Sequence, residues 1–167
     1  VLFERLDWRP YGIRPVLPIA STQPDGEPTR LDEFRGRVAA DLRERLIAAD
    51  EDQELGEALD RWELSLFQAE PFRSEQLRTA LDSLLGSGDG IWAAALRAAV
   101  LLGESGRDRA DQHARLRPLA DGGEAPDAAD GVRHALVETL LFGDRDGLVA
   151  ALDESLLGVR ASPGGRL

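Results

Sequence analysis

The sequence predicts an all-α protein, a compact bundle of about six to seven helices with two helical hairpins and an irregular, proline-rich N-terminal arm. Apolar residues recur at spacings of three and four from residue 31 onwards, the period of a helix with one buried face. A hairpin pattern occurs twice, in residues 77–103 and 132–158. In each copy an apolar helix ends on a Leu-Leu pair, a turn rich in Gly and Asp reverses the chain, and a second helix rich in Ala and Leu follows.

The first 30 residues are predicted to form an arm without helix. They hold five of the nine prolines, and proline lacks a backbone N–H and keeps the preceding residue out of the helical region. Residues 16–19 could add a short extended segment, and Trp8 and Tyr11 are expected to anchor the arm. The predicted organisation is an arm (1–30) packed on the domain, a single all-helical domain (31–160) and a frayed tail (161–167).

Two amphipathic helices are expected next. The first covers about residues 31–49, with an apolar stripe of Leu31, Phe34, Val38, Leu42, Leu46 and Ala49. An acidic cluster then opens the second helix, whose stripe is Leu55, Leu59, Trp62, Leu66 and Ala69. The cluster consists of Asp50, Glu51, Asp52 and Glu54. Because carboxylates stabilise the positive end of a helix dipole, this cluster has a structural reason to exist, and it is also our candidate partner-binding site.

The first hairpin is predicted to contain the most buried helix of the protein. Pro71 should end the second helix, and Ser74 can cap the third. Residues 86–90, with three glycines, form the tight turn. The fourth helix, residues 91–103, is apolar almost all round apart from Arg97, so it should lie at the centre of the bundle.

The second half of the chain is predicted to begin with a polar helix. This helix covers residues 107–119 and is expected to end near Pro118. A loop at 121–127 follows, and the second hairpin consists of helices at about 132–142 and 146–158.

Composition excludes several classes of protein. The chain of 167 residues has no Cys, which excludes disulfides, thiolate zinc sites and thiol nucleophiles. Its basic residues are all Arg, and without Lys neither a Walker loop nor a Schiff base can form. A formal net charge of −11 argues against nucleic-acid binding. The longest apolar run, residues 91–102, is too short to span a bilayer, so we expect a cytoplasmic protein with no membrane contact.

No catalytic or metal-binding pattern is present. The two histidines, His113 and His134, lie on separate predicted helices and outside the HExxH and Glu-x-x-His patterns. No serine stands in a GxSxG motif. We therefore expect a protein that is not an enzyme and that uses no metal or cofactor.

Two segments resemble a known family. Residues 92–119 combine an Ala/Leu helix with Arg107-Asp108-Arg109 and a final Leu-Arg-Pro-Leu, and residues 135–155 read ALVETLLFGDRDGLVAALDES. Both are similar to stretches of the immunity protein forty-nine family, all-helical bacterial proteins of polymorphic toxin systems. The resemblance implies a protein that binds and neutralises a cognate toxin domain.

Three functions remain open from the sequence. The first is a non-enzymatic binding protein, most specifically an immunity protein, with Asp50, Glu51, Asp52 and Glu54 as candidate contacts. The second is a helical scaffold or regulatory module with another protein partner, or a homodimer through the apolar face of helix 91–103. The third is a helical domain that binds a small molecule in a pocket lined by Trp62, Phe67, Phe72 and Trp92.

Overall fold

A computed structural model describes residues 2–4, 14–16, 32–48 and 51–163 of the chain. The chain divides into two units, Val1–Glu33 and Phe34–Leu167. In the first unit, strand β1 (Leu2–Glu4) pairs antiparallel with β2 (Arg14–Val16), and Phe3 lies opposite Pro15. Most of the predicted arm, including Trp8 and Tyr11, lies outside the described residues.

The second unit confirms the predicted all-α bundle. Its described residues form seven helices, and every predicted helix is found within a few residues of its expected bounds. These helices are α1 (Glu33–Ala48), α2 (Gln53–Ser65), α3 (Phe72–Leu85), α4 (Ile91–Leu102), α5 (Gly106–Ala120), α6 (Ala128–Phe142) and α7 (Arg145–Leu156).

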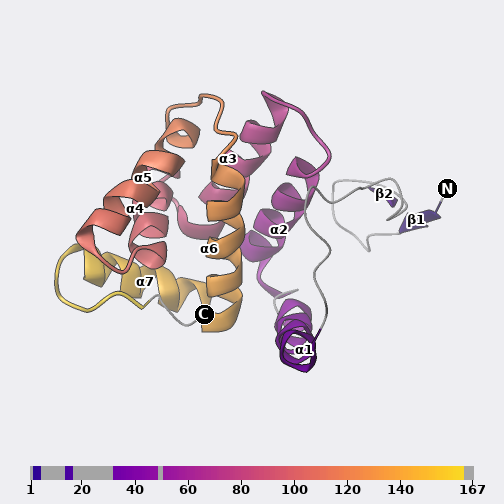
Figure 1. Cartoon of the computed structure of the whole chain (residues 1–167), viewed down its shortest axis with the longest axis horizontal. Helices are drawn as coiled ribbons and strands as arrows, with labels where there is room; N and C mark the ends of the chain where they lie inside the picture. The colour runs from indigo at the N-terminus through magenta and orange to yellow at the C-terminus, as the bar shows by residue number, and fades with distance from the viewer. Residues whose placement is uncertain (1, 5–13, 17–31, 49–50, 164–167) are drawn as a thin grey trace. The chain divides into compact units, whose positions relative to one another are not determined.

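Helix α4 is the centre of this bundle, as its sequence predicts. It packs against α3, α5, α6 and α7, and α7 lies crosswise to α4 and α6 (Figure 1). Ala94, Ala95 and Ala98 are completely buried, and their small side chains let neighbouring helices approach closely. The largest completely buried apolar side chains come from the surrounding helices: Leu77, Leu81, Leu84, Leu85, Leu116, Leu119, Val132, Leu148 and Leu152.

Glycines make both hairpin turns possible. Gly90, which directly precedes α4, has φ of 85°, and Gly143, which ends α6, has φ of 82°. Side chains other than hydrogen are strained in this left-handed region, so the chain reverses at glycine in both hairpins.

The single charge of α4 joins the two hairpins. Arg97 is 4% exposed, and its Nη1 donates to the carbonyl oxygens of Leu85 and Gly86 at 2.9 and 2.8 Å. Its Nε and Nη2 donate to the two carboxylate oxygens of Asp153 on α7, at 2.7 and 2.9 Å. The hydrogen bond with Asp153 is the main cause that raises the pKa of Arg97 above its ordinary value. Arg97, the charged residue of an otherwise apolar helix, therefore connects the end of α3 to α7.

The predicted cap of the third helix is wrong. Helix α3 begins at Phe72, two residues before Ser74, and the Glu70 carboxylate accepts hydrogen bonds from the Ser74 backbone N–H and hydroxyl. The Ser74 hydroxyl oxygen in turn accepts from the buried N–H of Ala125, at 2.8 Å. Ser74 thus connects α3 to the loop before α6.

The fifth helix ends two residues after Pro118, close to its predicted end. Helix α5 continues to Ala120, because a proline in the last turn removes only one amide donor. The Pro118 carbonyl still accepts from the Gly123 N–H at 2.9 Å, which closes the helix end. Helix α6 also begins earlier than predicted, at Ala128.

The apolar stripe of α1 is only partly covered. No residue between Glu33 and Ile47 is buried; Leu42 packs against the core, whereas Phe34 at the start of the stripe is 68% exposed. In the last turns of the helix, Arg45 donates hydrogen bonds to carbonyl oxygens of α6, and it also borders the candidate site.

Candidate functional site

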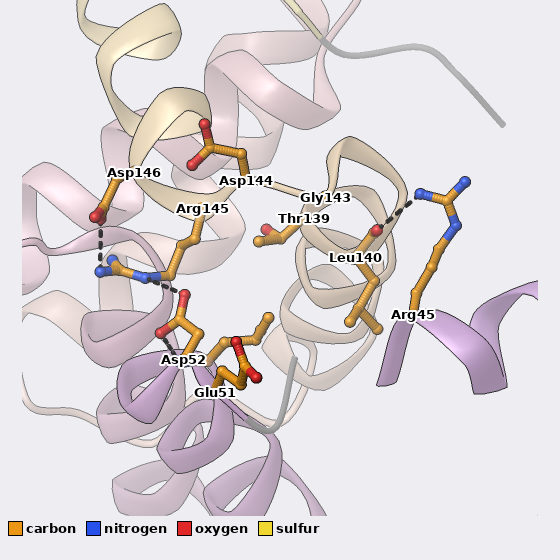
Figure 2. A pocket seen from close by; sticks show the side chains of 10 residues that line it. Arg45, Glu51, Asp52, Thr139, Leu140, Gly143, Asp144, Arg145 and Asp146 are labelled. Carbon is orange, nitrogen blue, oxygen red and sulfur yellow. Dashed lines mark hydrogen bonds and ion pairs between the residues drawn. The ribbon is translucent and has the colours of Figure 1, made fainter. Parts of the chain in front are cut away.

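A cleft of about 400 Å³ lies where the N-termini of α2 and α7 meet the end of α6. We call it the α2–α7 cleft; its polar and apolar walls include Arg45, Glu51, Asp52, Leu140, Arg145 and Asp146. In Figure 2, Asp52, Arg145 and Asp146 lie on one side of the cleft, and Arg45 and Leu140 lie on the other. Two members of the predicted acidic cluster, Glu51 and Asp52, therefore line a concave surface.

Arg145 organises one wall of the α2–α7 cleft. It is 8% exposed; its Nε donates to Asp52 Oδ2 at 3.3 Å, and its Nη2 donates to Asp146 Oδ1 at 2.8 Å. The same Nη2 forms an ion pair with Glu54. Its Nη1 is buried and has no hydrogen-bond partner in the part of the chain that the structure describes. This guanidinium holds the start of α7 against the start of α2.

Asp52 serves both helix and cleft. Its Oδ1 accepts from the backbone N–H groups of Glu54 and Leu55 at 3.0 Å each, so it caps α2. Its other oxygen accepts from Arg145. Asp144 caps α7 in the same way, accepting from the Gly147 N–H at 3.0 Å. The cleft is thus bordered by two capped helix N-termini.

Arg45 forms the opposite wall. Its Nη1 donates to the carbonyl oxygens of Leu141 and Leu140 at 2.9 and 3.2 Å, and its Nε donates to Asp41 at 2.8 Å. The last carbonyls of a helix lack partners within the helix and carry its negative dipole end, so a guanidinium is favourable there. Arg45 therefore connects α1 to the end of α6.

The four predicted contact residues have different surroundings. Asp52 and Glu54 are engaged by Arg145, whereas Glu51 is exposed on the cleft wall and pairs with no described residue. Asp50 lies outside the described residues. Of the residues described, Glu51 is the member of the cluster whose charge is most available to a partner.

Sequence reasoning did not identify Arg145. A usable signal was present, because a cation at a helix N-terminus faces the positive dipole end and is unfavourable without a partner. An Arg between Asp144 and Asp146 at the start of a helix therefore indicates a contact with an acidic group elsewhere in the chain. The acidic cluster at the start of the second helix was the natural candidate.

The acidic charge of the protein is concentrated in the helical bundle. Residues 51–163 contain 22 Asp or Glu and 11 Arg, and the other residues contain nine of each sign. The whole formal net charge of −11 therefore lies within residues 51–163. Two of these Arg, Arg97 and Arg145, are buried against carboxylates, so they do not offer cationic groups at the surface.

The histidines and aromatic residues form no site that the structure supports. His134 Nε2 lies 2.8 Å from Arg133 Nη2, and within the described ranges no group of three potential metal ligands occurs. Trp62 packs partly buried against the core, and Phe67, Phe72 and Trp92 are exposed, so they do not enclose the pocket that was considered for a small molecule.

Within the described residues, no helix combines the length and the apolar character needed to cross a bilayer. Comparison with protein-family models, with curated proteins and with solved structures finds no match to this chain.

Proposed function

We propose that this protein is a non-enzymatic binding protein whose acidic helical bundle binds a basic protein partner. The observation that carries the proposal is the charge distribution, with 22 acidic residues against 11 Arg in residues 51–163. Such a surface attracts a basic partner over a long range and raises the rate of encounter. The α2–α7 cleft adds a concave contact, at which Glu51 is exposed.

In its most specific form, the proposal is an immunity protein that neutralises a cognate bacterial toxin domain in the cytoplasm. The resemblance of residues 92–119 and 135–155 to the immunity protein forty-nine family supports this form. Both segments fall on packed helices of the bundle, α4–α5 and α6–α7. An all-helical scaffold with an acidic exterior suits masking of a basic toxin surface.

Co-expression tests this function. A toxin domain encoded beside the gene of this protein would be expressed in bacteria with and without the full chain, and growth would be measured. We expect growth arrest with the toxin alone and recovery with the protein. Persistent arrest, with both proteins present in the soluble fraction, would contradict the immunity proposal.

A second candidate is a homodimer or scaffold that uses the outer face of α4. Trp92 and Leu96, one helical turn apart, are 47% and 43% exposed although α4 is the central helix. Light scattering coupled to size-exclusion chromatography distinguishes a monomer from a homodimer. A mass near 36 kDa, twice the 18.2 kDa of the chain, would favour the homodimer.

A further inference from the structure

A second concavity, larger than the α2–α7 cleft, lies where the end of α4 meets the first turns of α5, the middle of α6 and residues 161–162. It encloses about 640 Å³, and we call it the α4–α6 cleft. Its apolar wall includes Leu101 and Leu102, and its polar wall includes Glu104, Gln112, His134 and Glu138. None of these residues belongs to the predicted acidic cluster.

Glu138 is the unusual group of this cleft. It is 7% exposed, yet no hydrogen-bond donor or cation among the described residues pairs with its carboxylate. Its carboxylate oxygens are not fully enclosed by protein. The carboxylate therefore faces the open space of the cleft. A nearly buried charge without a counter-ion is costly, and a cationic group placed in the cleft would remove that cost.

The basic residues nearby do not supply the missing counter-charge. Arg109 lines the cleft, but its Nε donates to the Gly103 carbonyl at 3.1 Å, and it forms no ion pair with Glu138. Arg133 donates to Asp130 at 2.7 Å and to His134 Nε2 at 2.8 Å. The other ring nitrogen of His134, Nδ1, lies 3.9 Å from Asp130 Oδ2, so Arg133 and His134 both contact Asp130, and neither forms an ion pair with Glu138.

The approach to Glu138 is acidic. A smaller hollow of about 300 Å³ shares Leu102, Glu104 and Gln112 with the α4–α6 cleft, and it is also lined by Asp108, Asp111 and Arg115. Glu104 and Asp111 are both exposed. In the two hollows together, the carboxylates of Glu104, Asp108, Asp111 and Glu138 outnumber the guanidinium groups of Arg109 and Arg115, so the potential in this region favours a cation.

We infer that the α4–α6 cleft binds a guanidinium or alkylammonium group, with the Glu138 carboxylate as its ion-pair partner. The methylene groups beside such a cation would lie against Leu101 and Leu102, as long basic side chains do on apolar surfaces. Two sources share this chemistry: an Arg or Lys side chain of a basic protein, or a free amine. The assignment to a side chain of a basic protein rests on the proposed function, whereas the binding of a cation in this cleft does not.

Titration followed by two-dimensional NMR of the full chain at low salt tests the inference. The probes are agmatine and the capped tripeptide acetyl-Gly-Arg-Gly-amide. We expect saturable shifts centred on Leu102, Gln112 and Glu138 for at least one probe. Tighter binding of the tripeptide would identify a protein side chain as the ligand, and tighter binding of agmatine would identify a free amine.

Two variants make the titration specific. Glu138→Gln should weaken binding by about tenfold or more, because it removes the charge and keeps the shape. Glu75→Gln removes the same charge from an exposed position on α3, which lines neither cleft, and should leave the affinity unchanged. Glu138→Gln is expected to fold, since it removes an unpaired charge, and a thermal melt checks this. A second variant, Glu138→Asp, keeps the charge and should retain part of the binding.

The results separate this inference from the proposed function. Absent or non-saturable shifts, shifts centred on the α2–α7 cleft, or equal losses in both Gln variants would overturn the cation site. Saturable binding that depends on Glu138, in a protein that fails to protect against the toxin, would uphold the site and contradict the immunity function.

Discussion

Replacing Arg97 with methionine is expected to destabilise the bundle strongly, because this residue joins both hairpins. The guanidinium is 4% exposed and bonds two carbonyls at the end of α3 and the Asp153 carboxylate on α7. It also bonds Asp89 in the turn between α3 and α4. Methionine keeps the length and the helix propensity of the side chain while removing every donor.

The expected loss is about 3 kcal/mol of unfolding free energy. Breaking a buried ion pair by removing one partner costs roughly 3–5 kcal/mol. The lower end applies because the carboxylates of Asp89 and Asp153 are 61% and 42% exposed, so water can solvate them once the guanidinium is gone. The carbonyls of Leu85 and Gly86 cannot be hydrated as easily, and each lost hydrogen bond costs about 1 kcal/mol.

Urea unfolding followed by far-ultraviolet circular dichroism measures this loss. The matched control is Arg78→Met on α3, an exposed arginine with no ion pair to a described residue, which should change stability by less than about 0.5 kcal/mol. Two-state behaviour is checked by comparison with tryptophan fluorescence. If Arg97→Met were as stable as Arg78→Met, Arg97 would not hold the hairpins together.

Three further outcomes are expected. Glu138→Gln should raise the unfolding free energy of the protein without ligand by about 1 kcal/mol in urea, because it removes a nearly buried, unpaired charge, and an unchanged or lower value would contradict that description. Arg145→Met should lower the unfolding free energy by about 2 kcal/mol, less than Arg97→Met. The variant loses the contact with Asp52, but it also removes the buried Nη1 that has no partner, which offsets part of the loss. A larger loss than that of Arg97→Met would be inconsistent with this reasoning. The hydrogen bond from Arg133 lowers the pKa of Asp130, so Asp130 adds stability above its unfolded pKa of about 3.9 that is lost as the pH falls through the lower folded pKa. The stability difference between wild type and Asp130→Asn should therefore shrink below about pH 4 in acid titrations of unfolding, and a difference that grows there would refute the sign.

The helices of the bundle could be predicted from the sequence because local signals agree with one another. The helix predicted at 91–103 is found at Ile91–Leu102, where an apolar run directly follows Gly90. Asp52 was predicted within an acidic helix start, and it caps α2 through two backbone N–H groups. In both places one stretch of chain contains the whole cause of the structure.

The errors arise where the decisive partner is distant in sequence. Ser74 reads as a cap, but Glu70 takes that role and leaves the Ser74 hydroxyl to Ala125, 51 residues further on. The candidate site shows the same limit: the ion pairs of Asp52 and Glu54 with Arg145 on α7 could not be foreseen from the sequence, and the contact of these residues with a partner stays a prediction. Periodicity places residues on a helix face, but it does not reveal which charge from another helix meets them.

Isothermal titration calorimetry with the proposed partner, a toxin domain encoded beside the gene of this protein, tests the central claim most directly. The claim is that the acidic bundle, residues 51–163, binds a basic protein. We predict a one-to-one complex at about 25 mM salt whose affinity falls markedly at about 300 mM, because salt screens the attraction between the two surfaces. No heat of binding at low salt, or an affinity that does not depend on salt, would contradict the claim.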